Sequence, residues 1–408
     1  MKFTTYRLNE ICDAKSGKRL PLGSDFSKEI TKYKYIRARD IKQGKIDVSN
    51  CGYISEEVKK KISKYIIEEN DVAITIVANI GDVGFCGQDA SGANLTENAV
   101  RLTNFNPQKC FSKYLAYYLA QPCLKKYMEG LAIGAAQAKL GIYKVNQIKV
   151  QLPLVEEQKK ITSIIENYDN LIETNNKRIK ILEQMAENLY KEWFVRFRFP
   201  GHETTPIENG IPKSWRIDKI ENISNVTDGV HNTIQDTPNS PYLLLSCKNI
   251  KDGKIQIGEN ERTIDEKTFL TLRKRTQLSK GDILITSVGT IGDVHLLNQE
   301  PSYIEFQRSV AIIKPNKELV NSCYLYETFK SMRKEFENAA HGAAQQCLFI
   351  GDINRMKVCL PPFKICQLFE KKVQQIYDLI LTLSNQCDNL IKQRDLLLPR
   401  LMSGKLAV

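Results

Sequence analysis

Apolar residues recur with alternating spacings of four and three through residues 155–198, a stretch that contains neither glycine nor proline. This average spacing of 3.5 residues lines up apolar side chains in one seam, which is typical of a helix that packs along a partner helix. The seam is interrupted only by Asn175 and otherwise contains Ile161, Ile165, Tyr168, Ile172, Ile179, Leu182, Ala186, Leu189 and Trp193. The pattern predicts one long helix that needs a mate.

A second seam with the same spacing lies in residues 366–406. It is interrupted by Arg394 and otherwise contains Phe369, Val373, Ile376, Ile380, Leu383, Cys387, Leu390, Leu397 and Leu401. The two helices are therefore predicted to pair within one molecule, and Asn175 either fixes their register or lies at a wet edge. The simpler alternative is an ordinary pair of amphipathic helices in a larger helical domain.

The remainder of the chain repeats in the same order. The first half contains ARDIKQGKID (38–47), NDVAITIVANIGDVG (70–84) and IGAAQAKLGIYKVNQIKVQLP (133–153), and the second contains SCKNIKDGKIQ (246–256), GDILITSVGTIGDVH (281–295) and HGAAQQCLFIGDINRMKVCLP (341–361). The matched segments are offset by about half the chain, far more than the roughly 20–50 residues of a solenoid repeat. This predicts two tandem domains related by a pseudo-twofold axis, with the two long helices antiparallel.

Each half combines short β-branched runs with later helical stretches. The predicted strands include 71–77, 98–103, 282–288 and 308–314, and the helical stretches are 111–129 and 322–340. We therefore predict an α+β fold with four parts: a first globular domain over 1–153, a spacer helix over 154–199, a linker and second globular domain over 200–361, and a second spacer helix over 362–408.

Composition limits the function further. The formal net charge of +12 favours a polyanionic partner. The amino terminus lacks the apolar run of a signal peptide, and no stretch approaches 18 apolar residues, so we expect a soluble, cytoplasmic protein. The 11 cysteines form no CxxC pair and are expected to be reduced and mostly buried.

Motifs of enzymatic chemistry are missing. No Gly-Lys pair is followed by the Ser or Thr of a phosphate-binding P-loop, there is no HExxH, and the four histidines are far apart in sequence. There is no glycine-rich S-adenosylmethionine loop and no Asn/Asp-Pro-Pro-aromatic motif of base methyltransferases. The sequence thus gives no support for a catalytic or metal site.

Three segments at the ends of the spacer helices carry a family resemblance. LYKEWFVRFRFPG (189–201), RDLLLPRLMSGKL (394–406) and QLPLVEEQKKI (151–161) resemble conserved regions of the specificity subunit of type I restriction-modification systems. The opening of the second helix, CLPPFKICQLF (359–369), departs from this pattern because it lacks the acidic pair before Gln367. The IGDVG-type turns and GAAQ segments are similar to motifs of that family's target recognition domains.

The resemblance implies a division of labour. Each globule would be a target recognition domain that reads one half of a split DNA sequence, and the antiparallel helix pair would set the gap and carry two modification subunits. Those subunits would use S-adenosylmethionine, and restriction subunits would use ATP and Mg. This chain itself would catalyse nothing.

Residues that could contact DNA are those with paired donors or acceptors for bases, or with cations and small hydroxyls for phosphates. The candidates in the first half are Lys15, Ser16, Lys18, Arg19, Arg37, Arg39, Asn79, Asn94, Thr96 and Gln137. Those in the second half are His231, Asn232, Thr233, Lys248, Asn249, Thr290, Gln307, Arg308 and Gln345. The two sets differ in chemistry, as expected if the halves read different sequences.

Other interpretations remain open from the sequence. Asn79 and Thr290 fit plain turn positions, Gln137 and Gln345 fit caps of buried backbone, and Arg37, Arg39 and Lys248 fit solvated strand edges. A coiled-coil adaptor with two protein-binding domains, or a nuclease or methyltransferase with unfamiliar motifs, are the competing functions.

Overall fold

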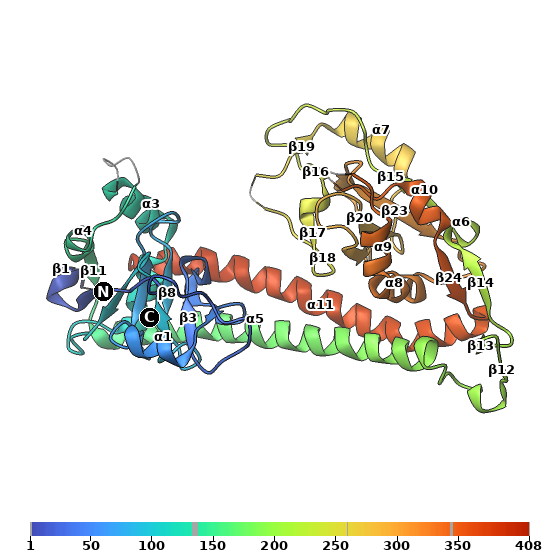
Figure 1. Ribbon diagram of the computed structural model, residues 1–408. Coiled ribbons are helices and arrows are strands. Elements are labelled where there is room, and N and C mark those ends of the chain that lie inside the picture. The colour runs from blue at the N-terminus through green and yellow to red at the C-terminus, as the bar shows by residue number, and fades with distance from the viewer. Residues whose placement is uncertain (1, 133–137, 259, 343–345, 408) are drawn as a thin grey trace. The chain divides into compact units, whose positions relative to one another are not determined.

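The computed structural model describes residues 2–132, 138–258, 260–342 and 346–407 (Figure 1). The chain divides into two compact units, Met1–Glu173 with Asp388–Val408, and Thr174–Cys387. Each unit therefore contains one globule together with parts of both long helices. Gln137 and Gln345, two of the predicted DNA contacts, lie outside the described residues.

The described part of the unit 1 globule is built from short strands and four α-helices. Its strands are β1 (Thr4–Arg7), β2 (Asp13–Ser16), β3 (Lys34–Ile36), β4 (Ile41–Lys42), β5 (Gly44–Ile46), β6 (Gly52–Tyr53), β7 (Val72–Thr75), β8 (Val83–Phe85), β9 (Asn94–Leu95), β10 (Ala99–Thr103) and β11 (Lys149–Leu152). Its helices are α1 (Glu56–Lys61), α2 (Ser112–Leu119), α3 (Pro122–Leu131) and α4 (Ile142–Asn146).

The globule of unit 2 follows a short linker hairpin, β12 (Ile207–Glu208) and β13 (Ile211–Pro212). Its strands are β14 (Arg216–Lys219), β15 (Ser224–Asp228), β16 (Tyr242–Leu245), β17 (Ile250–Lys251), β18 (Lys254–Ile255), β19 (Thr263–Ile264), β20 (Ile283–Thr286), β21 (Val294–Leu296), β22 (Ile304–Phe306), β23 (Val310–Pro315) and β24 (Lys357–Leu360). Its helices are α6 (Ile220–Ile223), α7 (Glu266–Thr276), α8 (Ser322–Ser331), α9 (Arg333–Ala339) and α10 (Ile350–Arg355).

The sheets of the two globules have the same strand order, which confirms the predicted α+β duplication. Unit 1 has the sheets β2-β10-β7-β8-β5-β4, β6-β3-β9 and β1-β11. Unit 2 has β15-β23-β20-β21, β19-β16-β22 and β14-β24, with β17-β18 as a separate ribbon. In both, β1-β11 or β14-β24 joins the two ends of the globule, because its last strand pairs antiparallel with its first.

One residue explains why the main sheet has six strands in unit 1 and four in unit 2. Gly84 on β8 allows β5 to pair beside it, since a Cβ there would lie 2.7 Å from the Lys45 carbonyl oxygen. His295 occupies the matching position on β21, and its Nδ1 donates to the Gly253 carbonyl at 2.6 Å. A side-chain hydrogen bond therefore holds the β17-β18 ribbon where backbone pairing holds β4-β5.

The two predicted spacer helices are α5 (Val155–Tyr190) and α11 (Phe363–Met402). A π-helical turn, Lys191–Val195, ends the first, so the regular helix stops short of residue 199. The chain then turns through Phe197, whose φ is 57°. The second helix contains Pro399 in its last turn and is followed by Gly404 at a φ of 71°.

The seams of α5 and α11 face the interior of each unit. The buried members are Ile161, Ile165, Ile179, Ala186, Trp193, Phe369, Val373, Ile380, Leu383, Cys387 and Leu401. The half-buried members are Tyr168, Ile172, Leu182, Leu189, Ile376, Leu390 and Leu397. In unit 1 the start of α5 packs with the end of α11, and in unit 2 the end of α5 packs with the start of α11. The pair is therefore antiparallel, as predicted.

Both polar residues of the seams have partners inside their own unit. Asn175 Nδ2 lies 3.5 Å from Gln386 Oε1, and Arg394 Nη1 donates to Asp169 Oδ1 at 2.8 Å. These pairs satisfy groups that would otherwise be costly to bury in an apolar seam.

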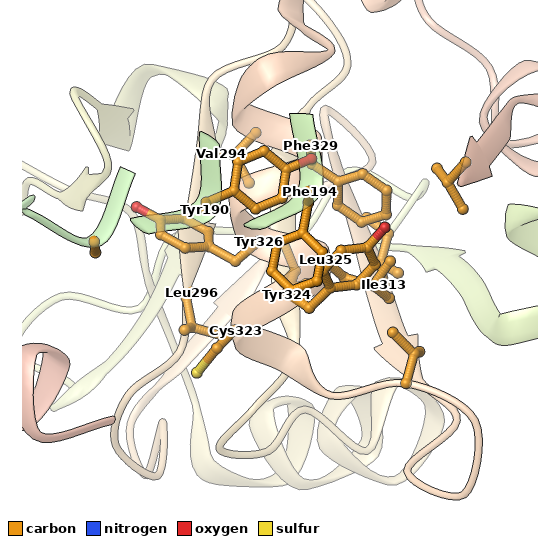
Figure 2. Close-up of a cluster of buried hydrophobic side chains, with 14 of the residues drawn as sticks. Tyr190, Phe194, Val294, Leu296, Ile313, Cys323, Tyr324, Leu325, Tyr326 and Phe329 are labelled. Atoms are coloured by element: carbon orange, nitrogen blue, oxygen red, sulfur yellow. The ribbon is translucent and has the colours of Figure 1, made fainter. Parts of the chain in front are cut away.

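The core of unit 2 joins its globule to the helix pair through aromatic side chains (Figure 2). Phe194 packs edge-on against Tyr324 of α8, with ring centroids 4.7 Å apart. Tyr190 Oη donates to Thr328 Oγ1 at 3.2 Å, so the buried hydroxyl keeps a hydrogen bond. In unit 1 the corresponding core combines Tyr114 of α2 with Ile161, Ile165 and Leu401.

Among the described residues, no helix combines the length and apolar character needed to cross a membrane. They also contain no group of three or more His, Cys, Asp or Glu side chains placed to hold a metal ion.

We predict that His295 makes unit 2 sensitive to mild acid. Burial lowers the pKa of His295 below its usual range, so the unfolded chain takes up a proton more readily than the folded one. The stability contributed by neutral His295 is present above the unfolded pKa and is lost as the pH falls below about 6.5. Between pH 8 and pH 5.5, the melting temperature should fall less for His295→Gln than for the unaltered protein, because glutamine keeps a side-chain N–H donor but cannot titrate. An equal fall in both proteins would contradict the assignment.

Candidate nucleic-acid interface

A tight backbone crossing gathers three predicted DNA contacts in unit 2. Gly229 packs so closely on the chain after β22 that a Cβ would lie 2.0 Å from the Phe306 carbonyl oxygen. The next residue, Val230, donates its backbone N–H to that oxygen at 2.9 Å. Only glycine fits the crossing, and it brings the loop containing His231 beside Gln307 and Arg308.

These residues line a cavity of about 460 Å³. Its wall includes Asp228, His231, Ser287, Gln307, Arg308 and Phe349. Phe349 is 55% exposed, a large apolar ring left facing solvent beside polar groups. A ring with flanking amide and guanidinium groups can contact base edges and stack on bases.

The carboxylate in the wall of this cavity, Asp228, is already paired with neighbouring side chains. Asp228 interacts with His231 Nε2 at 2.6 Å and with Arg275 Nη2 at 3.1 Å. Arg308 is exposed and makes no ion pair with any residue that the structure describes. Its guanidinium is therefore available to a phosphate or a guanine edge.

A second cavity, of about 440 Å³, also has Gln307 in its wall. Lys248 lies there and pairs with Glu261 at 2.9 Å. Burial acts to raise the pKa of Glu261, but the hydrogen bonds from Lys248, Asn249 and the Gly258 N–H, with the charge of Lys248, together outweigh it, so the pKa is lowered. Lys248 is thus held by a carboxylate that stays ionised.

Unit 1 has the same crossing with different side chains. A Cβ on Gly17 would lie 2.1 Å from the Thr96 carbonyl oxygen, and the backbone N–H of Lys18 donates to the Leu95 carbonyl at 2.8 Å. Arg19 occupies the place of His231, and Glu97 occupies the place of Arg308. Arg19 and Glu97 lie 4.0 Å apart, and their side chains are 76% and 45% exposed.

Four further predicted contacts of unit 1 and two of unit 2 lie at the surface. Lys15 and Ser16 lie on β2, Lys18 has its Nζ 5.8 Å from the Tyr65 ring centre, and Arg39 is 68% exposed. Asn232 and Thr233 are exposed in the loop after Gly229. These positions fit contacts to phosphates, which need reach and charge.

Four predicted contacts are instead part of the protein's own structure. Asn94 is fully buried and donates to the Ile62 carbonyl at 2.7 Å, and Asn249 is 2% exposed and donates to the Gln256 carbonyl at 2.9 Å. Buried Thr96 accepts from the Asn98 N–H at 3.3 Å. Arg37 binds Asp40 and the Asn50 carbonyl. Their polar atoms stabilise the domain, so we remove these four from the candidate DNA contacts.

Asn79 and Thr290 occupy equivalent turns. Their carbonyls accept from the hydroxyls of Thr75 and Thr286, and both side chains are exposed. The turn therefore accounts for the backbone carbonyls of both residues, and their exposed side chains remain candidate DNA contacts.

Sequence reasoning missed Glu97, Arg275 and Phe349. Glu97 could have been found by aligning the two crossings, because it matches Arg308. Phe349, from the segment before α10, lies in the wall of the cavity, and Arg275 of α7 binds Asp228 in that wall, so only the fold brings either of them to this site.

The family model described as type I restriction modification DNA specificity domain matches residues 1–184 and 236–399. The chain belongs to this family. The first matched segment contains the globule of unit 1 with Gly17, and the second, which begins after Gly229, contains the greater part of the globule of unit 2, including Phe306 of its crossing.

Relatives of similar size support the assignment. The type I restriction enzyme MjaIX specificity subunit of Methanocaldococcus jannaschii is 25% identical, over 87% of this chain and 82% of its own. The HindI specificity subunit of Haemophilus influenzae is 23% identical, over 64% of this chain and 70% of its own. The crystal structure of a type I S subunit from M. genitalium matches with a TM-score of 0.60 at 15% identity, covering 98% of this chain and 96% of the other, which shows a shared fold.

We predict that Arg308→Ala weakens DNA binding. If Arg308 contacts a base, the loss should be about 1–3 kcal/mol and should relax sequence preference at one position. If it contacts a phosphate, binding should weaken on all sequences and the salt dependence should drop by about one counterion. Binding titrations at several salt concentrations separate the two.

Arg216→Ala is the matched control, since Arg216 is an exposed arginine that pairs with Asp218 on β14. It should leave binding unchanged. Equal DNA affinity and salt dependence for Arg308→Ala and the unaltered protein would exclude Arg308 from the interface.

Proposed function

We infer that this chain is the DNA-reading subunit of a type I restriction-modification complex and that its two globules address the two halves of a split target. The observation that carries this is the repeated glycine crossing with different exposed side chains, Arg19 and Glu97 in one domain and His231 and Arg308 in the other. A backbone geometry that both domains share, with different exposed side chains in each, fits two domains that recognise different half-sites.

The charge of the chain fits this role. Its formal net charge of +12 favours contact with the phosphate backbone, which positions a protein on DNA without specifying sequence. The few exposed groups around each crossing then supply base discrimination. The division between positioning and reading explains why only part of the cationic surface needs to differ between the domains.

The helix pair has two tasks in this proposal. It sets the gap between half-sites, because α5 and α11 each run from one unit into the other. It also carries the modification subunits, for which the exposed apolar side chains of α5, Leu171, Ile181 and Met185, are suitable contacts.

The chemistry belongs to the partners. Modification subunits would bind S-adenosylmethionine and methylate adenine, and restriction subunits would use ATP and Mg. The complex would act on DNA in the cytoplasm.

The experiment that tests the function is methylation mapping. The chain is expressed with its modification subunit in a host free of DNA methylation, and the DNA is sequenced for N6-methyladenine. We expect one split motif with a fixed gap. A stable complex that adds no methylated motif would refute the proposal and favour a protein-binding adaptor.

Lengthening both helices should widen the gap. Seven residues inserted after Glu173 and after Cys387 keep the 3.5-residue seam in phase and add about 10 Å. That rise equals about three base-pair steps. Methylation mapping should return the same half-sites with a longer gap.

The control inserts seven residues in α5 alone, which breaks the antiparallel register and should abolish modification. New half-sites with an unchanged gap would exclude the helix pair as the determinant of spacing.

A further inference from the structure

A buried hydrogen bond ties the globule of unit 1 to its spacer helix. Tyr117 of α2 donates from Oη to Asp169 Oδ2 of α5 at 2.6 Å, and the two residues are 8% and 5% exposed. Asp169 Oδ1 accepts from Arg394 Nη1 at 2.8 Å, and Lys45 Nζ lies 4.0 Å from Oδ2. We call these contacts the first joint.

A matching bond in unit 2 runs in the opposite direction. Tyr377 of α11 donates from Oη to Glu327 Oε1 of α8 at 2.6 Å, and these residues are 4% and 1% exposed. Lys330, which lies on α8 with Glu327, balances the carboxylate at 3.1 Å. These contacts form the second joint.

The residues of the two joints occupy equivalent positions in the duplication. The sequence SKYL at 112–115 matches SCYL at 322–325, which aligns Tyr117 with Glu327. Seam residues Ile161 and Ile165 match Phe369 and Val373, which aligns Asp169 with Tyr377. Donor and acceptor have therefore exchanged sides between the repeats.

A second link in the same joints is reversed as well. In unit 1 the helix supplies the amide, since Gln158 Oε1 accepts from the Phe111 N–H at 2.8 Å and its Nε2 donates to the Lys109 carbonyl at 2.9 Å. In unit 2 the globule supplies it, since Asn321 Nδ2 donates to the Cys366 carbonyl. The same alignment matches Phe111 with Asn321 and Gln158 with Cys366.

The protonation states support fixed donor and acceptor roles. Burial, with the neighbouring carboxylate, raises the pKa of Tyr117 and of Tyr377 above the usual range. Both tyrosines stay neutral at physiological pH, so each can only donate to its charged partner.

We propose that the two reversed joints form a positional key, by which each recognition domain fits only its own end of the helix pair. A domain transferred to the other end would meet the wrong partner. Glu327 would face Asp169, placing two carboxylates together in a buried site, and Tyr117 would face Tyr377 with no acid to bind. Phe111 would face Cys366 and lose the acceptor of its N–H.

The key can be tested within the first joint by a double-mutant cycle. Tyr117→Glu should lower the melting temperature of unit 1, by roughly 5–10 °C, because it opposes two buried carboxylates. Asp169→Tyr should also lower it, because Arg394 loses its buried carboxylate partner and keeps only the exposed Asp395. The double variant recreates the chemistry of the second joint, and we expect it to recover at least half of the summed losses.

Space allows this exchange. A cavity of about 210 Å³ lies beside the first joint, with Tyr117 and Asp169 in its wall, and removal of the Tyr117 ring enlarges it. The mirrored set in the second joint, Glu327→Tyr, Tyr377→Asp and both together, should show the same recovery. Tyr143→Glu is the control, because Tyr143 is 69% exposed and its replacement should leave stability unchanged.

Additive losses in both cycles would overturn the key. Tyr117→Phe separates the loss of a hydrogen bond from the repulsion between two carboxylates. It removes only the hydroxyl and should therefore lower the melting temperature much less than Tyr117→Glu. If both variants lose the same stability, carboxylate opposition is not the determinant.

Domain grafts test the consequence directly in the full chain. Residues 216–360 are placed in the position of residues 4–152, with and without Glu327→Tyr. We expect the graft with Glu327→Tyr to resist limited proteolysis better than the graft without it, and equal resistance would contradict the key. These measurements use no DNA, so they can fail or succeed independently of the proposed function.

Discussion

The structure depends on the burial of two apolar seams, one on each long helix. An isolated helix would expose its seam to water, which is unfavourable. The helices α5 and α11 expose the seam residues along their whole length unless each finds a partner, and each finds it in the same chain. Burial of each large apolar side chain contributes about 1.5–3 kcal/mol, so the seams together outweigh many surface contacts. Because the seams also form part of each globule's core, folding a globule and pairing the helices become one event in each unit.

The globules show how a duplicated backbone accommodates different chemistry. Glycine at 17 and at 229 is required by the close approach of a carbonyl, and this fixes the crossing regardless of what surrounds it. The residues beside the crossing face solvent and have no such constraint. They are Arg19 and Glu97 in one domain and His231 and Arg308 in the other. A domain that recognises DNA needs its side chains to vary at such solvent-facing positions.

The same freedom extends into buried positions, provided that partners change together. Gly84 and His295 hold equivalent ribbons by backbone pairing and by a side-chain hydrogen bond, respectively. Tyr117 with Asp169 and Glu327 with Tyr377 satisfy equivalent joints in opposite directions. In each case the cost of an unsatisfied buried polar group preserves the pairing while the residues that make it differ.

The sequence alone determined the duplication, the α+β class, the two long helices and their antiparallel pairing, because apolar periodicity and recurring segments are local or linear signals. It also identified Arg308, His231 and Gln307 by residue type. It could not distinguish them from Asn94 and Asn249, which also carry side-chain donors but are buried and bonded to backbone carbonyls, that of Ile62 for Asn94 and that of Gln256 for Asn249. Nor could it find Arg275 and Phe349 or the reversed joints. Burial and hydrogen-bond partners depend on which distant segments meet, and only the tertiary structure decided that.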